Sequence, residues 1–539
     1  MPVITRMTRM RQPASLPGAA DPAASPGERE RRAVRLGVAG AVLAVLVVGL
    51  LQALTVPPFL WTDEPSHYAY ADEVSRGHLP TIETPVRTGG SVTLERIMAR
   101  RDPARRTIWT ANHPPLFYLA EAGPVRAATA LAGPDAGLIA GRIMSVLLAA
   151  AGVALVGLLA RLLVPGRPAV AVAAAALAGL LPSFASISAR LFNDSLAFLT
   201  ATALFAVAVA WIVKGPSPAR LGLLAAAAAA AAATRASGLL AVGVAGLAVL
   251  AGSWLHAHER GTRRPWLAGA GPGLVVAVAV AATSGWFWLR NLRLYGDLTG
   301  SAALLARFER APRGSALGIL RDPGFWEVQQ RRLWDPTYDL TALAPNQTRS
   351  LWLLGLIPLA GLLLAGVGFL RRRRAGLTGP PPPGRNRLTV AWLLGIVLLG
   401  LMQLSVAMFA ADGGGAHARY LFPALGVLAV AAAAGLAALP LGRRGLPALA
   451  LIAAMTTADV WTWTHGLTVM LRPAPADVLG TAFEASGLPS PAVVLTVAGV
   501  LLALALAAQA VALWRLGVPA RQPAPAEAAA PERTPAPVG

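Results

Sequence analysis

The chain has 539 residues, of which 55% are hydrophobic and 14% charged, with a mean hydropathy of +0.57. Soluble globular proteins carry roughly 25% charged residues, so this composition excludes an ordinary soluble fold and predicts an all-α polytopic membrane protein. The net charge of +21 comes almost wholly from arginines that stand between apolar runs, which indicates membrane topology and anionic lipid headgroups rather than nucleic-acid binding. Cysteine is absent, which excludes disulfides, thiol catalysis and thiolate metal sites.

The N-terminal residues 1–35 are polar and contain no cleavable signal, so we expect a disordered cytoplasmic tail. The first span, about 36–56, then acts as a signal anchor. Residues 57–137 form a long extracytoplasmic loop, whose charges are compatible with the positive-inside tendency because long loops largely escape it.

The rest of the chain predicts about twelve spans in all, within a membrane domain at 36–514. Basic clusters such as Arg371–Arg374 fall on one side throughout, which places both termini in the cytoplasm. A second large outer loop is expected at 290–348 and a disordered cytoplasmic tail at 515–539. The further spans are expected at 138–160, 169–189, 195–213, 221–234, 237–255, 267–289, 350–370, 388–410, 420–440, 446–466 and 492–514.

The segment "FLWTDEPSHYAYADEVSRGHLP" follows the first span and begins with the acid pair Asp63 and Glu64. Two carboxylates at the bilayer centre would cost about 5–7 kcal/mol, so the pair must lie at the outer interface. A helix from Pro65 to Arg76 separates apolar from polar residues, which predicts a helix lying on the membrane surface. The acid pair is then either an ordinary helix cap or part of a site that includes His67.

Other polar residues are expected on the same outer side. Each has a local explanation, as a turn, a helix cap or an arginine that extends toward the headgroups. Arginine also binds phosphate through its planar donor fork. Asp459, inside a predicted span, is a further candidate because a lone intramembrane acid is often functional. The outer-side candidates are Asn112 and His113 in "TANHPP", Asp194 in "FNDSL", Arg290 and Arg293 in "WFWLRNLRLYGDLTG", and His417 and Arg419 in "DGGGAHARYLFPA".

Several segments in order resemble the GT-C superfamily of polytopic glycosyltransferases. The resemblance is to family 39, the protein mannosyltransferase and aminoarabinose transferase-like enzymes, or to a related uncharacterised bacterial membrane family. It covers roughly residues 36–430. The matching segments are "TDEPSHYAYADEVSRGHLP", "NHPPLFYLA", "AGRIMSVLLA", "RLFNDSLAFLTATALF", "RNLRLYGDLTG" and "ARYLFPALGVLA".

This resemblance implies a GT-C-like fold with surface-lying helices in the first outer loop, at 65–76 and 114–130. It implies a catalytic acid in that loop, which falls on Asp63 with Glu64 beside it, and a polyprenyl-phosphate-linked sugar as donor. The break "TRAS" departs from the lysine-glycine often found there and leaves the role of Arg235 open.

The resulting hypothesis is an inverting transfer of sugar to an unidentified extracytoplasmic acceptor in the cell membrane, with Asp63 as general base. A general base typically contributes about 10²–10⁴-fold. Arg419, and after it Arg290 and Arg293, would stabilise the leaving lipid phosphate. No cofactor or obligatory metal is expected, although Asp63, Glu64 and Asp194 offer oxygens suited to a hard cation. A transporter or flippase of lipid-linked intermediates and a non-catalytic relative are the alternatives.

Overall fold

The computed structural model describes residues 25–60, 63–334, 351–374, 384–471 and 477–517. Within these ranges the chain is helical, and a single isolated bridge between Pro85 and Thr107 is the β-type pairing present. This confirms the predicted all-α class.

The first half of the chain contains ten α-helices in the described ranges. They are α1 (Pro26–Thr55), α2 (Glu64–Ser75), α3 (Val92–Arg100), α4 (Leu116–Leu163), α5 (Ala169–Gly179), α6 (Pro182–Ser188), α7 (Asp194–Lys214), α8 (Pro218–Ala232), α9 (Ala236–Glu259) and α10 (Ala270–Val280). Because α1 begins at Pro26, residues 26–35 are helical and not part of a disordered tail. Residues 1–24 and 518–539 lie outside the described ranges.

The second half adds the helices of the second predicted outer loop and of the last predicted spans. They are α11 (Trp286–Tyr295), α12 (Ser301–Arg307), α13 (Ala316–Arg321), α14 (Pro323–Trp334), α16 (Leu356–Arg374), α17 (Arg385–Ala411), α18 (Leu425–Leu436), α19 (Leu446–Met470), α20 (Val478–Ala485) and α21 (Pro491–Gly517).

Nine helices in the described part of the chain are long and apolar enough to cross a membrane, or ten if the bent pair α5 and α6 is one span. The pair is bent by 61° at a short break before Pro182, a residue suited to a helix start. Two further predicted spans correspond to shorter apolar helices at 218–232 and 353–368. Since a spanning helix needs about 20 residues, the count of twelve is not confirmed, whereas the polytopic architecture is.

The helix α4 joins the end of the first outer loop to the second predicted span. Its helical geometry is interrupted at Ala132 and Gly133, where glycine adopts φ +84°, a conformation that other residues rarely take. The predicted amphipathic segment at 114–130 and the predicted span at 138–160 therefore lie on either side of this kink.

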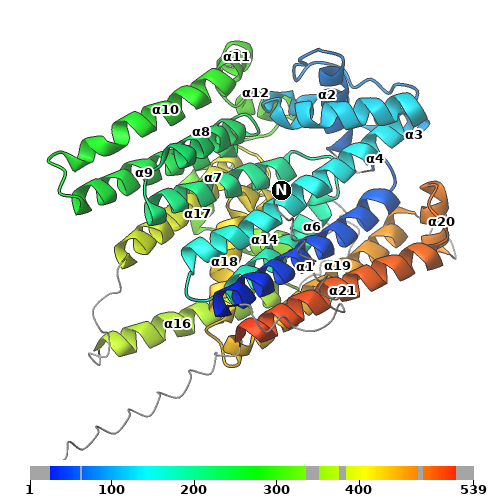
Figure 1. Ribbon diagram of the computed structural model, residues 1–539. Coiled ribbons are helices and arrows are strands. Elements are labelled where there is room, and N and C mark those ends of the chain that lie inside the picture. Colours follow the sequence, from blue (N-terminus) through cyan, green and yellow to red (C-terminus); the bar gives the residue numbers. More distant parts are fainter. Residues whose placement is uncertain (1–24, 61–62, 335–350, 375–383, 472–476, 518–539) are drawn as a thin grey trace, which may run out of the picture.

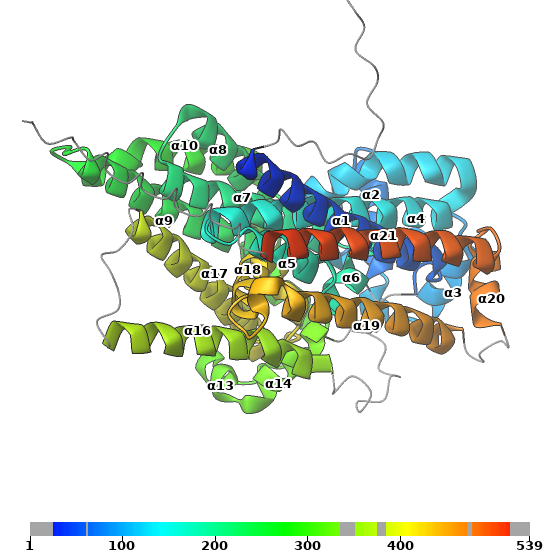
Figure 2. The ribbon, with the colours of Figure 1, turned by 60° about the horizontal axis from the view of Figure 1, so that its bottom comes forward.

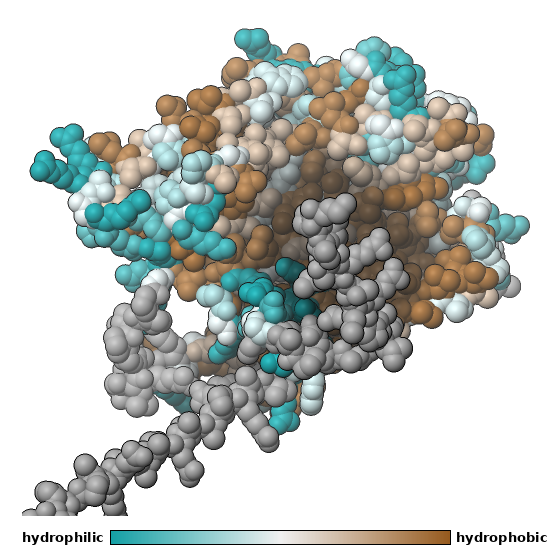
Figure 3. Space-filling view, in the orientation of Figure 1, coloured by the Kyte–Doolittle hydropathy of each residue, from teal (hydrophilic) through white to brown (hydrophobic). Residues whose placement is uncertain are grey.

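The long helices run roughly alongside one another, and α2, α3 and α12 lie together at one end of them (Figure 1). A second view shows α16 with α13 and α14 on one side of the bundle and α8 and α10 on the other (Figure 2). A broad apolar surface separates hydrophilic groups over α2 and α3 from those at the far ends of α9 and α10 (Figure 3). This distribution suits a protein with its middle in lipid and its ends in water.

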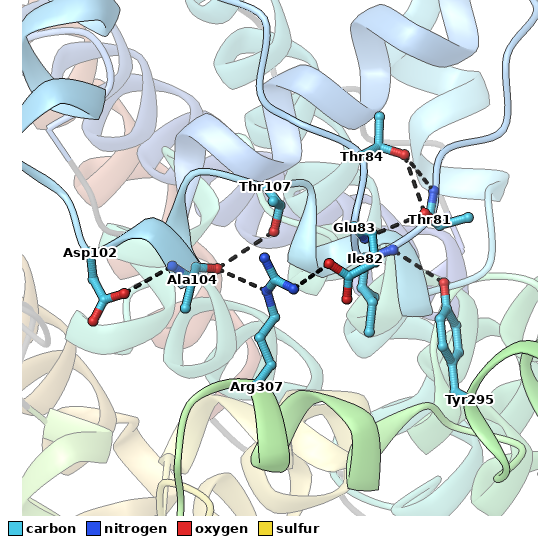
Figure 4. A network of polar contacts seen from close by, with 9 residues as sticks. All are labelled: Thr81, Ile82, Glu83, Thr84, Asp102, Ala104, Thr107, Tyr295 and Arg307. Carbon is cyan, nitrogen blue, oxygen red and sulfur yellow. Dashed lines mark hydrogen bonds and ion pairs between the residues drawn. The ribbon is translucent and has the colours of Figure 1, made fainter.

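The two predicted outer loops are bound to each other rather than separate. Arg307 of α12 forms an ion pair with Glu83 and also donates to the carbonyl of Ala104 (Figure 4). The Tyr295 hydroxyl accepts a hydrogen bond from the Ile82 amide over 3.2 Å. These contacts fix the loop segment that contains α2 against the second outer loop.

The helix α2 differs from the exposed surface helix that its sequence predicts. Residues Glu64 to Glu73 are all buried, the polar ones included. The polar face is accommodated because its acids have basic partners: Asp72 pairs with Arg76, and Glu73 contacts Arg87.

Candidate functional site

Asp63 is the residue that precedes α2, but its side chain does not cap the helix. The carboxylate instead accepts a hydrogen bond from Arg419 Nη2 over 2.6 Å, and only its backbone carbonyl accepts from the amides of Ser66 and His67. Arg419 lies in the short turn η6 (Ala418–Ala424), 356 residues along the chain. Helix capping therefore does not explain the carboxylate of Asp63.

Arg419 connects Asp63 to a second acid–arginine pair. Its Nη1 lies 3.9 Å from Asp194 Oδ2, and Asp194 Oδ1 forms an ion pair with Arg235. None of the four side chains is more than 10% exposed. We refer to Asp63, Arg419, Asp194 and Arg235 as the ion-pair cluster; it contains two acids and two arginines and is balanced in charge.

The cluster is assembled from the starts of four elements: α2, α7, α9 and η6. Asp194 is the first residue of α7, and Arg235 immediately precedes α9 at the break "TRAS". Helix starts favour acids but disfavour arginine, because of the helix dipole. The position of Arg235 is therefore explained by Asp194 and not by its own helix.

Burial alone would raise the pKa of Asp63, since it removes water from the carboxylate. The charge of Arg419 and its hydrogen bond act more strongly in the opposite direction, so the pKa of Asp63 lies below its usual value. Asp63 is consequently ionised at neutral pH and held in a charge-assisted hydrogen bond.

Aromatic rings line the cluster. The guanidinium of Arg419 lies 5.3 Å from the ring centre of Phe192, and that of Arg235 lies 4.9 Å from the ring of Tyr420. Such contacts between arginine and an aromatic face are favourable and also limit water at the site.

Two predicted histidines lie beside the cluster. His67 Nδ1 is 2.9 Å from the Tyr118 hydroxyl, and its ring centre is 5.0 Å from that of Phe192. Burial, followed by the charges of Arg419 and Arg235, lowers the pKa of His67 well below its usual value. Burial, followed by the charge of Arg235, also lowers the pKa of His113 well below its usual value, although His113 is only half-buried. Both rings are therefore neutral.

Glu64 turns away from the cluster and is fully buried. Both of its oxygens accept hydrogen bonds of 2.7 Å from Arg142 of α4, and neither side chain has any exposed surface. Arg142 also donates to the carbonyls of Ala53, Val56 and Pro57 at the end of α1. The contacts of Glu64 are thus those of a structural clasp between α1, α2 and α4, not those of a second catalytic acid.

Two of the remaining loop candidates, Asn112 and Arg290, form hydrogen bonds between the two predicted outer loops. The Asn112 side chain donates to the Thr299 carbonyl over 2.8 Å, while the backbone carbonyl of Asn112 accepts from the Asn291 side chain. Arg290 donates to the Pro80 carbonyl over 2.7 Å, and Arg293 is exposed. None of the three makes a described contact with the ion-pair cluster.

A cavity of about 490 Å³ lies next to the cluster, between α13, α14 and the outer end of α17. Arg310, Arg313 and Arg332 line it against a single acid, Asp322, which leaves two positive charges in excess. His417 lies in its wall, two residues before Arg419 in the chain. Near the cavity, Gly413 has a φ of +101° and approaches the Ala311 carbonyl closely, which excludes a larger residue at this position.

His417 links the cavity to the cluster. Its Nδ1 accepts from Arg332 Nη1 over 3.1 Å. Burial, then the charges of Arg419 and Arg332, lowers the pKa of His417 to about 3. Asp63 and Asp194 do not line the cavity. Each of them forms an ion pair with Arg419 directly.

The three acids that we considered as a cation site are each directed at an arginine. Asp63 faces Arg419, Glu64 faces Arg142, and Asp194 faces Arg235. Across the described ranges, no three histidine, aspartate or glutamate side chains come together as metal ligands. The carboxylates are thus arranged for ion pairs.

The sequence did not identify the three arginines that bind the predicted residues: Arg142 and Arg332 were not candidates, and Arg235 was noted without a role. Two of them carried a signal: Arg142 stands inside an apolar run and Arg235 interrupts one, and charges in such places are usually functional or paired. Arg332 carried none, since it lies in a polar loop segment.

No protein-family model matches the chain, and no curated protein does. Among solved structures, it is similar to ArnT from Cupriavidus metallidurans bound to undecaprenyl phosphate, with a TM-score of 0.46 and 16% identity over 90% of this chain and 76% of that one. It is also similar to the arabinosyltransferase EmbB from Mycobacterium smegmatis, with a TM-score of 0.41 and 14% identity over 88% of this chain and 41% of that one. For the archaeal oligosaccharyltransferase AglB from Archaeoglobus fulgidus, in complex with an inhibitory peptide and a dolichol-phosphate, the TM-score is 0.37 and the identity 13%, over 83% and 56% of the two chains. These are glycosyltransferases, the class that the sequence motifs resemble, but similarity at this level assigns no activity to the chain.

Proposed function

We propose that this protein is a membrane glycosyltransferase that moves a sugar from a polyprenyl-phosphate-linked donor to an extracytoplasmic acceptor. The observation that carries the proposal is the Asp63–Arg419 pair, a carboxylate and an arginine that lie 356 residues apart in the chain and form an ion pair. The motif resemblance gives the reaction class, and the neighbouring arginine-lined cavity suits a phosphate-bearing substrate.

The proposed reaction is a single displacement. The acceptor hydroxyl oxygen forms a bond to the anomeric carbon, while the bond from that carbon to the phosphate oxygen breaks. The electron pair of the broken bond remains on the lipid phosphate, and the hydroxyl proton passes to Asp63. One displacement inverts the configuration at the anomeric carbon.

The cluster's ion pairs suggest how donor binding activates the base. A carboxylate held by Arg419 is a weak base because its pKa is lowered. A donor phosphate offers Arg419 a second anionic partner. As Arg419 turns toward the phosphate, Asp63 loses its counter-charge and becomes more basic. In this proposal Arg235 remains on Asp194 and keeps that acid ionised and in place.

The cavity supplies the charge that the balanced cluster lacks. With two positive charges in excess, the cavity stabilises the donor's phosphate before transfer and the released lipid phosphate after transfer. In this proposal His417, neutral and bonded to Arg332, positions that arginine toward the cluster side of the cavity.

The decisive experiment is transfer in vitro from defined polyprenyl-phosphate sugars to an acceptor fraction from the cell envelope. We expect Asp63→Asn to reduce turnover by about 10²–10⁴-fold, the usual contribution of a general base. Glu95→Gln, which alters an exposed acid in the same loop, is the matched control and should retain activity. Full activity in Asp63→Asn would remove Asp63 from the base role, and no transfer from any donor would remove the proposed reaction.

A further inference from the structure

A second groove lies between α1 and α4, far from the ion-pair cluster. Its volume is about 650 Å³, and one end is basic while the rest is apolar. The basic end is formed by Arg31, Arg35 and Arg161. The apolar part is lined from both helices, by residues that include Val38, Val42 and Leu46 of α1 and Ala154, Gly157 and Leu158 of α4.

The groove follows from the spacing of residues on two packed helices. On α1 the lining positions recur at three- and four-residue intervals from Arg31 to Leu46, which places them on one helical face. On α4 the same spacing joins Ala154, Leu158 and Arg161. Leu158 is 49% exposed, so the groove opens outward to the apolar surface of the bundle.

The charges at the basic end favour an anion. Arg31 and Arg35 are exposed, and Arg161 lies 3.7 Å from Glu30. Three arginines against one acid leave two positive charges in excess beside an apolar channel. A ligand that matches this surface carries a negative headgroup and a hydrocarbon chain.

We propose that this groove binds an acidic phospholipid, with the headgroup phosphate among the three arginines and an acyl chain along the apolar walls. Basic pockets between spanning helices recognise acidic lipid headgroups in this way. The 20 helical steps from Arg35 to Thr55 at the end of α1 rise about 30 Å, the thickness of a bilayer core. The groove's arginines therefore lie across the membrane from Asp63, and the site is separate from the proposed catalytic one.

The test compares lipid retention by native mass spectrometry of the full-length protein in mixed micelles of phosphatidylglycerol and phosphatidylcholine. We expect the wild type to retain phosphatidylglycerol preferentially and Arg31→Ala/Arg35→Ala to bind it roughly 30-fold more weakly, since each arginine near a membrane surface contributes about fivefold. Arg29→Ala/Arg32→Ala is the matched control, because it removes the same charge from exposed arginines outside the groove.

A second variant tests the apolar part of the site without changing charge. Ala154→Phe fills the groove from an exposed position, and we expect it to lose the retained lipid while its thermal midpoint in lipid-free detergent stays unchanged. Equal losses in the two double variants would show diffuse surface attraction and overturn the proposal. Displacement of the lipid by glycerol phosphate alone would also overturn the proposal, because the site would then bind only the phosphate. A dimer that persists while lipid retention is the same in every variant would do so too, because a second copy of the chain would then cover the groove.

Discussion

At the scale of single residues, the partners of a charged group decide its role more than its own identity does. Asp63 and Glu64 are neighbours in sequence, yet one meets Arg419 in the cluster and the other is enclosed by Arg142. A buried carboxylate without a partner would cost several kcal/mol, so each acid requires its own arginine. This separation assigns the proposed chemistry to Asp63 and the positioning of α2 to Glu64.

His417 leads to a prediction about pH. Its pKa of about 3 in the folded protein lies below the ordinary value of 6.5, so the unfolded chain takes up a proton that the folded chain refuses. Stability is therefore fully present above pH 6.5 and falls as the pH decreases from 6.5 toward 3. The charges that act on the ring come from Arg419, Arg332, Asp63 and Arg235. None of them changes between pH 5 and pH 7, because arginine stays protonated and the pKa of Asp63 lies below its usual value.

We expect the thermal midpoint of the purified protein to decrease between pH 7 and pH 5, and His417→Asn to make this decrease smaller. Unfolding followed by tryptophan fluorescence measures both. The comparison at pH 8 is the control, since no histidine-linked difference in slope remains there. An identical pH dependence in the two proteins would show that His417 is protonated in the fold.

At the scale of elements, the Arg142–Glu64 clasp determines where α2 begins. Arg142 satisfies three carbonyls at the end of α1 and both oxygens of Glu64, and so joins three helices through one side chain. Removing one partner from a buried pair typically costs about 3–5 kcal/mol. We expect Glu64→Gln to lower the midpoint of unfolding substantially and to reduce activity through the displaced start of α2.

The matched comparison for this clasp is Glu73→Gln, which alters a buried acid of the same helix whose partners are exposed. Glu73→Gln should lower the midpoint of unfolding less than Glu64→Gln does, because water hydrates Arg87 and His78 when the Glu73 carboxylate is absent. Equal destabilisation by the two substitutions would show that the clasp has no special weight.

The sequence predicted the elements well where one local property decides them. Hydropathy predicted a polytopic bundle of helices, although not a confirmed number of spans. Loop arginines predicted one side of the membrane for Asp63, Asp194 and Arg419, and Arg419 is found in contact with both acids. It did not predict the bend after α5 or the burial of α2, because both depend on neighbouring helices. Nor could it predict that Arg235 pairs with Asp194, since helix packing decides which charges meet.

At the scale of the whole molecule, the chain lacks cysteine, which makes its sidedness easy to test. Ala99 in α3 and Thr262 after α9 are exposed residues at the two predicted faces. We expect Ala99→Cys to react with a membrane-impermeant maleimide on intact cells and Thr262→Cys to react only after the membrane is opened. The cysteine-free parent is the control, and the reverse pattern would invert the proposed topology.

The distance along the chain between Asp63 and Arg419 has a consequence for biosynthesis. At about 5–20 residues per second, the ribosome adds the intervening 356 residues in about 20–70 s. Throughout that interval Asp63 has been synthesised while Arg419 has not. The cluster therefore cannot close until the chain has been made through Arg419, after nine of the twelve predicted spans, and a chain truncated before that point carries Asp63 without its partner.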